Sequence, residues 1–308
     1  MKLHLIANPK AGAGRAAQRI PQIRRALADH GIEHELSLTE GPRDAARLAR
    51  LAAEKGAEVI GVVGGDGTVN EVAQCYVDER GEPRPGPALA LIPAGTGGDF
   101  RKTFGLDDNV VEAVRRLATA TPRDIDLGVA ELTNHAGSTE THAFINITSF
   151  GIGGLVDRLV NESPKWLGGR ASFLLGTLRA SLAYKNLAVS LRVDGKVCLE
   201  TPIVSVAICN GRYFGGGMKI APDADPSDGL FDVIAMCDLT RAQGIGLALK
   251  TYRGSHVGQP GVRVARGSEV EAVPLRKRDH VLIDLDGETP GRLPLRVHVL
   301  RGAVRLLA

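Results

Sequence analysis

Strand-like runs alternate with stretches of helical spacing in the first part of the chain. The runs lie at 3–7, 33–38, 59–63 and 88–92. Apolar residues recur every three or four positions at 15–30, 44–54 and 68–77. The runs predict strands and the stretches between them predict helices. Because alternating strands and helices form parallel β-α-β units with right-handed crossovers, we expect an α/β domain here.

The pattern changes after residue 124, where strand-like runs follow one another. These runs lie at 125–132, 143–149, 187–193, 203–209, 230–236, 281–285 and 293–300. Two helical stretches, 174–184 and 241–252, interrupt them. Consecutive strands separated by turns predict an antiparallel sheet or sandwich. We therefore expect an α/β domain at 1–123, completed by 297–308, and a β-rich substrate domain at 124–296.

Length and charge narrow the class of protein. The chain has 308 residues, more than one compact core usually holds, which agrees with two domains. Its net charge of +3 is too small to indicate nucleic acid as a partner. From Arg241 onward there are 12 basic and 6 acidic residues. This excess indicates either a solvated face or an attraction to an anionic membrane surface.

Cysteines and apolar runs indicate the compartment. The four cysteines show neither the spacing of a metal site nor that of a disulfide framework. The first residues form a strand rather than a signal peptide, and no apolar run approaches the ~18 residues of a membrane span. We therefore expect a cytoplasmic protein.

The 38 glycines are concentrated where strands lead into helices. Gly64–Gly67 follows a buried strand, and similar corners occur at Asn8–Gly14 and Gly95–Gly98. Glycine lets the backbone approach a ligand, and the N–H groups that begin a helix attract phosphate. Asp66 repels phosphate, so it would act through Mg²⁺; alternatively, Asp66 and Thr68 only cap their helix. Neither the Walker A pattern nor G-x-G-x-x-G is present at the first corner.

Five motifs together resemble a known family. They are Asn8-Pro9-x-Ala11-Gly12-x-Gly14, Gly64-Gly65-Asp66-Gly67-Thr68-x-Asn70-Glu71-Val72, Pro93-x-Gly95-Thr96-Gly97-x-Asp99-Phe100, Gly215-Gly216-Gly217-Met218 with Asp228-Gly229-Leu230, and Asp286-Gly287-Glu288. Their order and extent resemble the diacylglycerol kinase and sphingosine kinase superfamily, and its bacterial soluble lipid kinases in particular. One position departs from the family, because Gly98 stands where the family usually has Asn.

The resemblance implies an ATP-dependent kinase that phosphorylates the hydroxyl of diacylglycerol or a related lipid. The products would be phosphatidic acid, or another lipid phosphate, and ADP. The implied fold is a phosphofructokinase-like α/β domain followed by an antiparallel β-sandwich. The implied nucleotide-binding residues are Asn8, Gly12, Gly14, Thr39, Gly64, Gly65, Asp66, Gly67, Thr68, Asn70, Glu71, Gly95, Thr96 and Asp99.

Acidic residues in the second domain are candidates for the metal and the base. Three aspartates at 223, 225 and 228 suit Mg²⁺ or a plain turn equally well. The resemblance favours a structural Mg²⁺ held by Asp225, Asp228 and the Leu230 carbonyl. Asp286-Gly287 alone would indicate a β-turn. The resemblance makes Glu288 or Asp286 the proton acceptor, with Glu288 preferred and Asp286 supporting Mg²⁺.

Several partners remain open at this stage. A lipid kinase needs peripheral contact with a membrane surface, and Lys165-Trp166 with the helix around 173–184 is either a membrane-interface segment or a core helix. Open strand edges would allow a homodimer. Two alternatives to a lipid kinase are an NAD kinase, which shares Gly-Gly-Asp-Gly-Thr and the two-domain plan, and a non-catalytic nucleotide-binding regulator.

Overall fold

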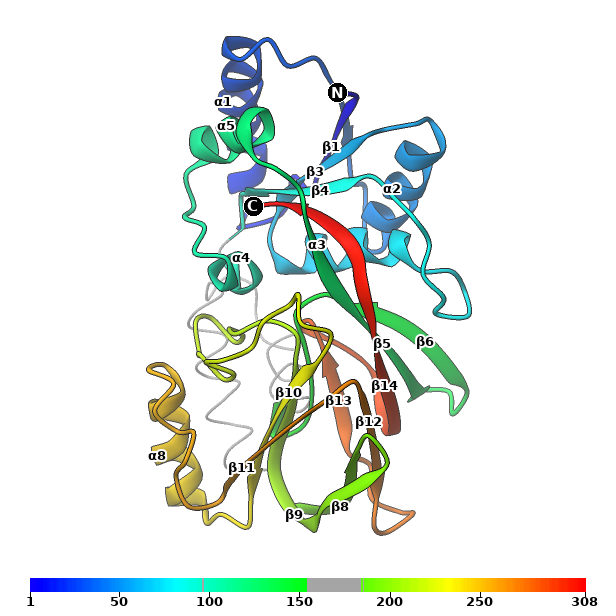
Figure 1. Cartoon of the computed structure of the whole chain (residues 1–308), viewed down its shortest axis with the longest axis vertical. Helices are drawn as coiled ribbons and strands as arrows, with labels where there is room; N and C mark the ends of the chain where they lie inside the picture. The colour runs from blue at the N-terminus through cyan, green and yellow to red at the C-terminus, as the bar shows by residue number, and fades with distance from the viewer. Residues whose placement is uncertain (96, 154–183, 185) are drawn as a thin grey trace. The chain divides into compact units, whose positions relative to one another are not determined.

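The computed structural model describes residues 1–95, 97–153, 184 and 186–308 (Figure 1). The chain divides into an N-terminal unit, Met1–Leu127 with Arg301–Ala308, and a C-terminal unit, Gly128–Leu300. The predicted domain ranges differ from these units by four residues at each boundary and stay a prediction. The predicted segment at Lys165-Trp166 lies outside the described residues, as does all but the last residue of the predicted helix 174–184.

A parallel sheet forms the centre of the N-terminal unit. Its strands are β1 (Leu3–Ala7), β2 (His34–Leu38), β3 (Val59–Gly64) and β4 (Ala88–Pro93). They are ordered β4-β3-β1-β2, and every neighbouring pair is parallel. The end of the last strand, β14 (Glu288–Leu307), adds a parallel partner to β4, where Leu306 pairs with Leu89. The red end of the chain therefore lies beside β4 in Figure 1.

Helices cover both faces of this sheet. They are α1 (Arg15–Asp29), α2 (Asp44–Glu54), α3 (Asp66–Ala73), α4 (Asp99–Thr103) and α5 (Val110–Thr119). Ile23 and Leu27 of α1 and Val114 of α5 pack with alternate strand residues such as Leu5 and Val63 in one core. Helices α2 and α3 pack against each other and against β1 and β3. The prediction of an α/β domain is confirmed.

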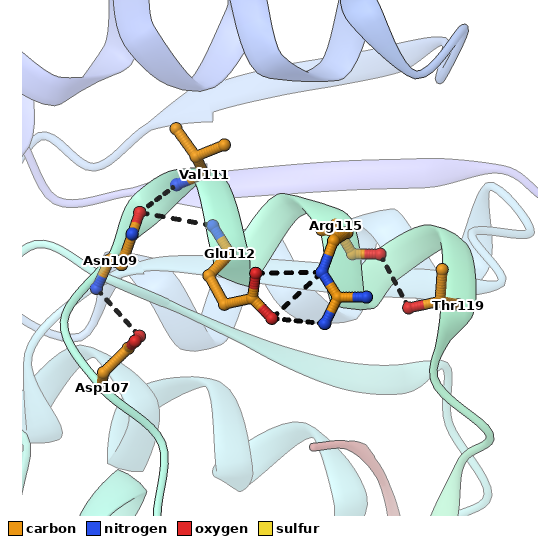
Figure 2. Close-up of polar contacts among 6 residues, drawn as sticks. All are labelled: Asp107, Asn109, Val111, Glu112, Arg115 and Thr119. Carbon is orange, nitrogen blue, oxygen red and sulfur yellow. Dashed lines mark hydrogen bonds and ion pairs between the residues drawn. The ribbon is translucent and has the colours of Figure 1, made fainter.

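Helix α5, which the apolar pattern did not predict, begins at a polar cap (Figure 2). The Asn109 side chain accepts hydrogen bonds from the backbone N–H groups of Val111, at 3.0 Å, and Glu112, at 3.3 Å. Such a cap satisfies two of the donors that a helix start leaves unpaired. One turn along, Arg115 contacts Glu112, and this hydrogen bond lowers the pKa of the Glu112 carboxyl.

The C-terminal unit is built from antiparallel strands. They are β5 (Arg123–Asn134), β6 (Thr139–Phe144), β7 (Ile147–Gly151), β8 (Leu187–Val193), β9 (Lys196–Cys209), β10 (Phe231–Cys237), β11 (Val262–Gly267), β12 (Glu269–Pro274), β13 (Leu282–Leu285) and β14. The pairings run from β9 through β7, β13, β14, β12 and β8 back to β9, and all are antiparallel. They enclose an apolar core that includes Phe144 and Phe231, whose rings stack 5.6 Å apart. The predicted β-sandwich architecture is confirmed.

Two details differ from the sequence prediction. The run 143–149 is not one strand, because β6 ends at Phe144 and β7 begins at Ile147. Strands β11 and β12 were not predicted, since charged residues interrupt their apolar positions. The helix predicted at 241–252 is present as α8 (Arg241–Thr251).

Within the described ranges, the model contains no helix with both the length and the apolar character that a membrane crossing requires.

We expect the return of the C-terminal strand to stabilise the N-terminal unit. Leu306 is fully buried, so Leu306→Ala should lower the free energy of unfolding by about 2–5 kcal/mol. Urea denaturation measures this loss, with the exposed Arg301→Ala as the matched control on the same strand. Equal stability of the two variants would contradict the pairing of β14 with β4.

Candidate active site

The three glycine corners lie at the carboxyl ends of adjacent parallel strands. Residues 8–14 follow β1, Gly65 follows β3, and residues 94–98 follow β4. The backbone N–H groups of Ala94 and Gly95 both donate to the Gly64 carbonyl at 3.0 Å, and Asn8 N–H donates to the Val63 carbonyl at 3.1 Å. The structure thus brings the predicted corners together at the sheet edge where open α/β folds bind ligands.

The corners after β3 and β4 approach so closely that only glycine fits. A Cβ at Gly95 would lie 2.6 Å from the Gly65 Cα and 3.0 Å from its nitrogen. Both neighbours are backbone atoms, which cannot rotate away as a side chain could. The backbone of this edge is therefore unobstructed by side chains at these two positions, which suits the close approach of a phosphate.

Asp66 connects the same two corners through its carboxylate. It accepts backbone hydrogen bonds from Gly98 at 2.8 Å, Asp99 at 2.9 Å and Phe100 at 3.3 Å. It does not cap its own helix, because Gly65 is the N-cap of α3 and no side chain bonds there. Desolvation raises the pKa of Asp66, the Asp99 charge adds to this rise, and the three backbone hydrogen bonds oppose it.

Gly98, the departure from the family pattern, is paired with an arginine that sequence reasoning missed. Gly98 has a φ of +96°, and a Cβ there would lie 2.5 Å from Arg101 Nε. Arg101 is held by a 2.6 Å hydrogen bond from its guanidinium to the Leu106 carbonyl. With Gly65, Asp66 and Gly98 it lines a pocket at this edge. The guanidinium thus occupies space beside Gly98 into which a side chain at that position would project.

Three other predicted nucleotide residues, Thr39, Glu71 and Asn70, make hydrogen bonds within the N-terminal unit. Thr39 is buried at the end of β2, where its N–H donates to the Ala7 carbonyl at 2.9 Å. Glu71 instead accepts from Ala45 N–H at 3.0 Å and so holds the start of α2. Asn70 is buried and accepts from the Gln74 side chain. Thr96 lies outside the described residues, and the nucleotide contacts of the whole set stay a prediction.

In the C-terminal unit, Asp286 organises backbone rather than standing free. Its carboxylate accepts hydrogen bonds from the N–H groups of Ile145 at 2.8 Å, Asn146 at 3.2 Å and Ile147 at 2.8 Å. Glu288, two residues later, is exposed at the start of β14. The carboxylate of Asp286 is thus tied to the backbone, whereas Glu288 is exposed.

Two further polar residues beside Asp286 escaped sequence reasoning. Asp284 is buried and accepts from Ser149 Oγ at 3.1 Å and Gly287 N–H at 2.8 Å. The Asn146 side chain donates to the Tyr213 carbonyl at 2.9 Å, and its buried Oδ1 has no partner among the described residues. Acidic residues at alternate positions 284, 286 and 288, and a lone Asn inside an apolar run, are the sequence signals for this cluster.

The loop predicted to hold a metal is paired with an arginine of a neighbouring strand, Arg266 of β11. Asp225 Oδ1 accepts from Ser227 N–H, and Asp228 Oδ1 accepts from Leu230 N–H, both at 3.0 Å. The guanidinium of Arg266 pairs with Asp228 Oδ2 and also lies 3.3 Å from the carboxylate of the buried Asp232. Among the described residues no three His, Cys, Asp or Glu side chains converge as metal ligands. Arg266 therefore pairs with one of the predicted Mg²⁺ ligands, and the metal role of Asp225, Asp228 and the Leu230 carbonyl stays a prediction.

Comparison with known proteins identifies the family. Residues 2–130 match the diacylglycerol kinase catalytic domain, and residues 146–308 match the YegS C-terminal NAD kinase beta sandwich-like domain. A "Probable lipid kinase YegS-like" of Chromohalobacter salexigens is 30% identical over 304 residues, covering 96% of this chain and 91% of that protein. A "Diacylglycerol kinase" of Bacillus subtilis is 27% identical over 299 residues, covering 95% and 91%.

Solved structures show the same fold. A crystal structure of a diacylglycerol kinase from Bacillus anthracis superimposes with a TM-score of 0.71 at 22% identity, covering 99% of this chain and 96% of that one. A yeast NADH kinase superimposes with a TM-score of 0.53 at 10% identity, covering 99% and 82%, which is a likeness of fold alone.

The glycine-lined edge and the two domain matches define a class of enzyme, the ATP-dependent lipid kinases. This chain belongs to the diacylglycerol kinase catalytic domain family, with a YegS-type C-terminal domain. The predictions of the family and of an ATP-dependent lipid kinase are confirmed. An NAD kinase enters only as the distant structural neighbour.

We expect Gly98 and Arg101 to be energetically coupled. Gly98→Ala should destabilise the protein because of its left-handed backbone and its contact with Arg101. In an Arg101→Ala background, only the backbone cost should remain, giving a coupling energy of about 0.5–1 kcal/mol in urea denaturation. Gly56→Ala, where φ is +79° and nothing lies within 4 Å, is the control for the backbone cost alone. Additive effects of the two substitutions would contradict the contact.

We expect Arg266 to replace a divalent ion in the Asp225–Leu230 loop. Arg266→Ala removes a charge that lowers the pKa of Asp232, a group whose pKa burial already raises. The melting temperature of the Arg266→Ala variant should fall by about 2–4 °C and should rise again when millimolar Mg²⁺ is added. The melting temperature of the unsubstituted protein should change little with Mg²⁺. The exposed Arg263→Ala on the same strand is the control. An equal Mg²⁺ response in both proteins would assign the loop to a metal instead.

Proposed function

We propose that this enzyme transfers the γ-phosphoryl group of ATP to the free hydroxyl of diacylglycerol, giving phosphatidic acid and ADP. The observation that carries the proposal is the convergence of three glycine corners at one sheet edge, with Asp66 fixing the spacing of two of them. The choice of lipid is supported by the relatives of Bacillus subtilis and Mycobacterium tuberculosis that bear the name diacylglycerol kinase.

The N-terminal unit would bind the phosphoryl donor. The backbone around Gly65 and Gly95 lacks side chains that would block a phosphate, and the first N–H groups of α3 have no acceptor within the helix. Thr39 directly follows β2, the strand that pairs with β1. Mg²⁺ bound with ATP would neutralise charge on the phosphate oxygens.

The C-terminal unit would supply the proton acceptor. The lipid hydroxyl oxygen forms a bond to the γ-phosphorus as the bond from that phosphorus to the bridging oxygen breaks, and ADP leaves with the electron pair. The hydroxyl proton passes to the Glu288 carboxylate, which is exposed at a strand end. Asp286 is a positioning residue, because its carboxylate is occupied by three backbone N–H groups.

The expectations about location and assembly stay predictions. They are a cytoplasmic protein, peripheral contact with a membrane surface, and a homodimer. Among the described strands, β11 pairs only with β10 and ends the strand order, so it is an edge at which a second copy could add.

Removing the Glu288 carboxylate should abolish turnover without unfolding the protein. With γ-labelled ATP and diacylglycerol, we expect Glu288→Gln to lower kcat by about 10²–10⁴-fold at an unchanged melting temperature. Asp286→Asn should lower both activity and melting temperature, because it weakens the hold on residues 145–147. The exposed Glu131→Gln in the same unit is the matched control. Mass spectrometry of the lipid extract identifies the product.

The same assay separates the alternatives. Near-normal kcat in Glu288→Gln would remove this residue from the chemistry. Labelling of NAD rather than lipid would make the chain an NAD kinase. ATP binding without transfer to either acceptor would make it a nucleotide-binding regulator.

A further inference from the structure

Helix α8 of the C-terminal unit presents a stripe of exposed apolar side chains. Ile245 and Leu249 are 52% and 70% exposed, and Tyr252, which directly follows the helix, is 51% exposed. Their spacing of four and three residues places them on one helix face. Leu249 is the most exposed large apolar side chain in the part of the chain that the structure describes. Single exposed apolar residues are ordinary, whereas an ordered stripe indicates a partner.

The opposite face of α8 already holds the helix in place. Leu247 is buried and packs in a cluster that includes Ile220 and Ile234. Thr251 is buried as well, and its carbonyl accepts a 2.8 Å hydrogen bond from Lys219 N–H. Thr240 begins the helix in a capping box. The core contacts of α8 thus lie on the side opposite the exposed stripe.

The stretch of sequence that carries the stripe has basic residues and no acidic ones. Residues 239–268 contain no Asp or Glu, and they include five basic residues: Arg241, Lys250, Arg253, Arg263 and Arg266. Lys250 and Arg253 are exposed and adjoin Leu249 and Tyr252 in the sequence. Apolar side chains flanked by basic ones are typical of helices that lie in the plane of an anionic membrane surface.

We propose that the α8 stripe, Ile245, Leu249 and Tyr252 with the adjacent Lys250 and Arg253, docks the enzyme on an anionic lipid bilayer (Figure 1). The three apolar side chains enter the head-group region, and the two cations contact anionic lipids. The proposal rests on the proposed function only for the choice of a bilayer as the partner, since an enzyme that phosphorylates diacylglycerol must reach a lipid surface.

Vesicle co-sedimentation tests the proposal on the full-length protein. The vesicles are phosphatidylcholine alone, or phosphatidylcholine with about one-quarter phosphatidylglycerol. Leu249→Gln should lower the fraction bound to anionic vesicles by about fivefold or more. Arg253→Gln should weaken binding to the anionic vesicles only. Added salt should likewise weaken the binding of the unsubstituted protein to anionic vesicles. Val197→Gln is the matched control, because Val197 is 51% exposed elsewhere in the same unit.

Two results would overturn the docking surface. One is equal vesicle binding by Leu249→Gln and Val197→Gln, with circular dichroism confirming that both are folded. The other is a Leu249→Gln variant that binds vesicles normally but changes from dimer to monomer in sedimentation velocity, which would make the stripe a contact between copies. A protein that binds vesicles through α8 but phosphorylates no lipid would overturn only the proposed function.

Discussion

The N-terminal unit depends on one carboxylate that bonds to three backbone amides. Asp66 begins α3. Its carboxylate accepts hydrogen bonds from the N–H groups of Gly98, Asp99 and Phe100, which lie at the start of α4. Hydrogen bonds to a carboxylate are stronger than neutral ones, so this side chain fixes the separation of two helix starts. The close approach of Gly65 and Gly95 lies directly beside it. The hydrogen bonds of Asp66 and the close approach of Gly65 and Gly95 therefore define the shape of this sheet edge.

The C-terminal unit uses the same device at the position where its strand pattern breaks. Asp286 accepts from the amides of Ile145 and Asn146, which separate β6 from β7, and from the amide of Ile147, the first residue of β7. The carboxylate satisfies amides that a continuous strand would have paired with a neighbour. In both units, the aspartate of a recognisable motif organises backbone. Glu288, two residues after Asp286, is by contrast exposed.

Local patterns predicted much of this fold, and long-range partners account for most of the misses. The run 187–193 is a strand with the predicted bounds, because its apolar alternation is regular. The run 143–149 was predicted as one strand, since the Asp286 that divides it lies about 140 residues away in the sequence. Likewise, the glycine corners were visible, whereas the partners of Asp66 were not. Helix α5 was overlooked although its signal is local, because Val110, Ala113, Val114 and Leu117 are buried at helical spacing behind the Asn109 cap.

Two arginines show why a motif alone does not specify its ligand. Arg101 lies over Gly98, where the family pattern has an amide side chain, and Arg266 lies between Asp228 and Asp232 beside the loop predicted to hold a metal. A guanidinium offers several donors in a fixed plane and stays charged across the physiological range. It can therefore satisfy carboxylates that would otherwise require a dissociable ion. Because Arg266 belongs to the chain, its pairing with Asp228 and Asp232 does not depend on a bound ion.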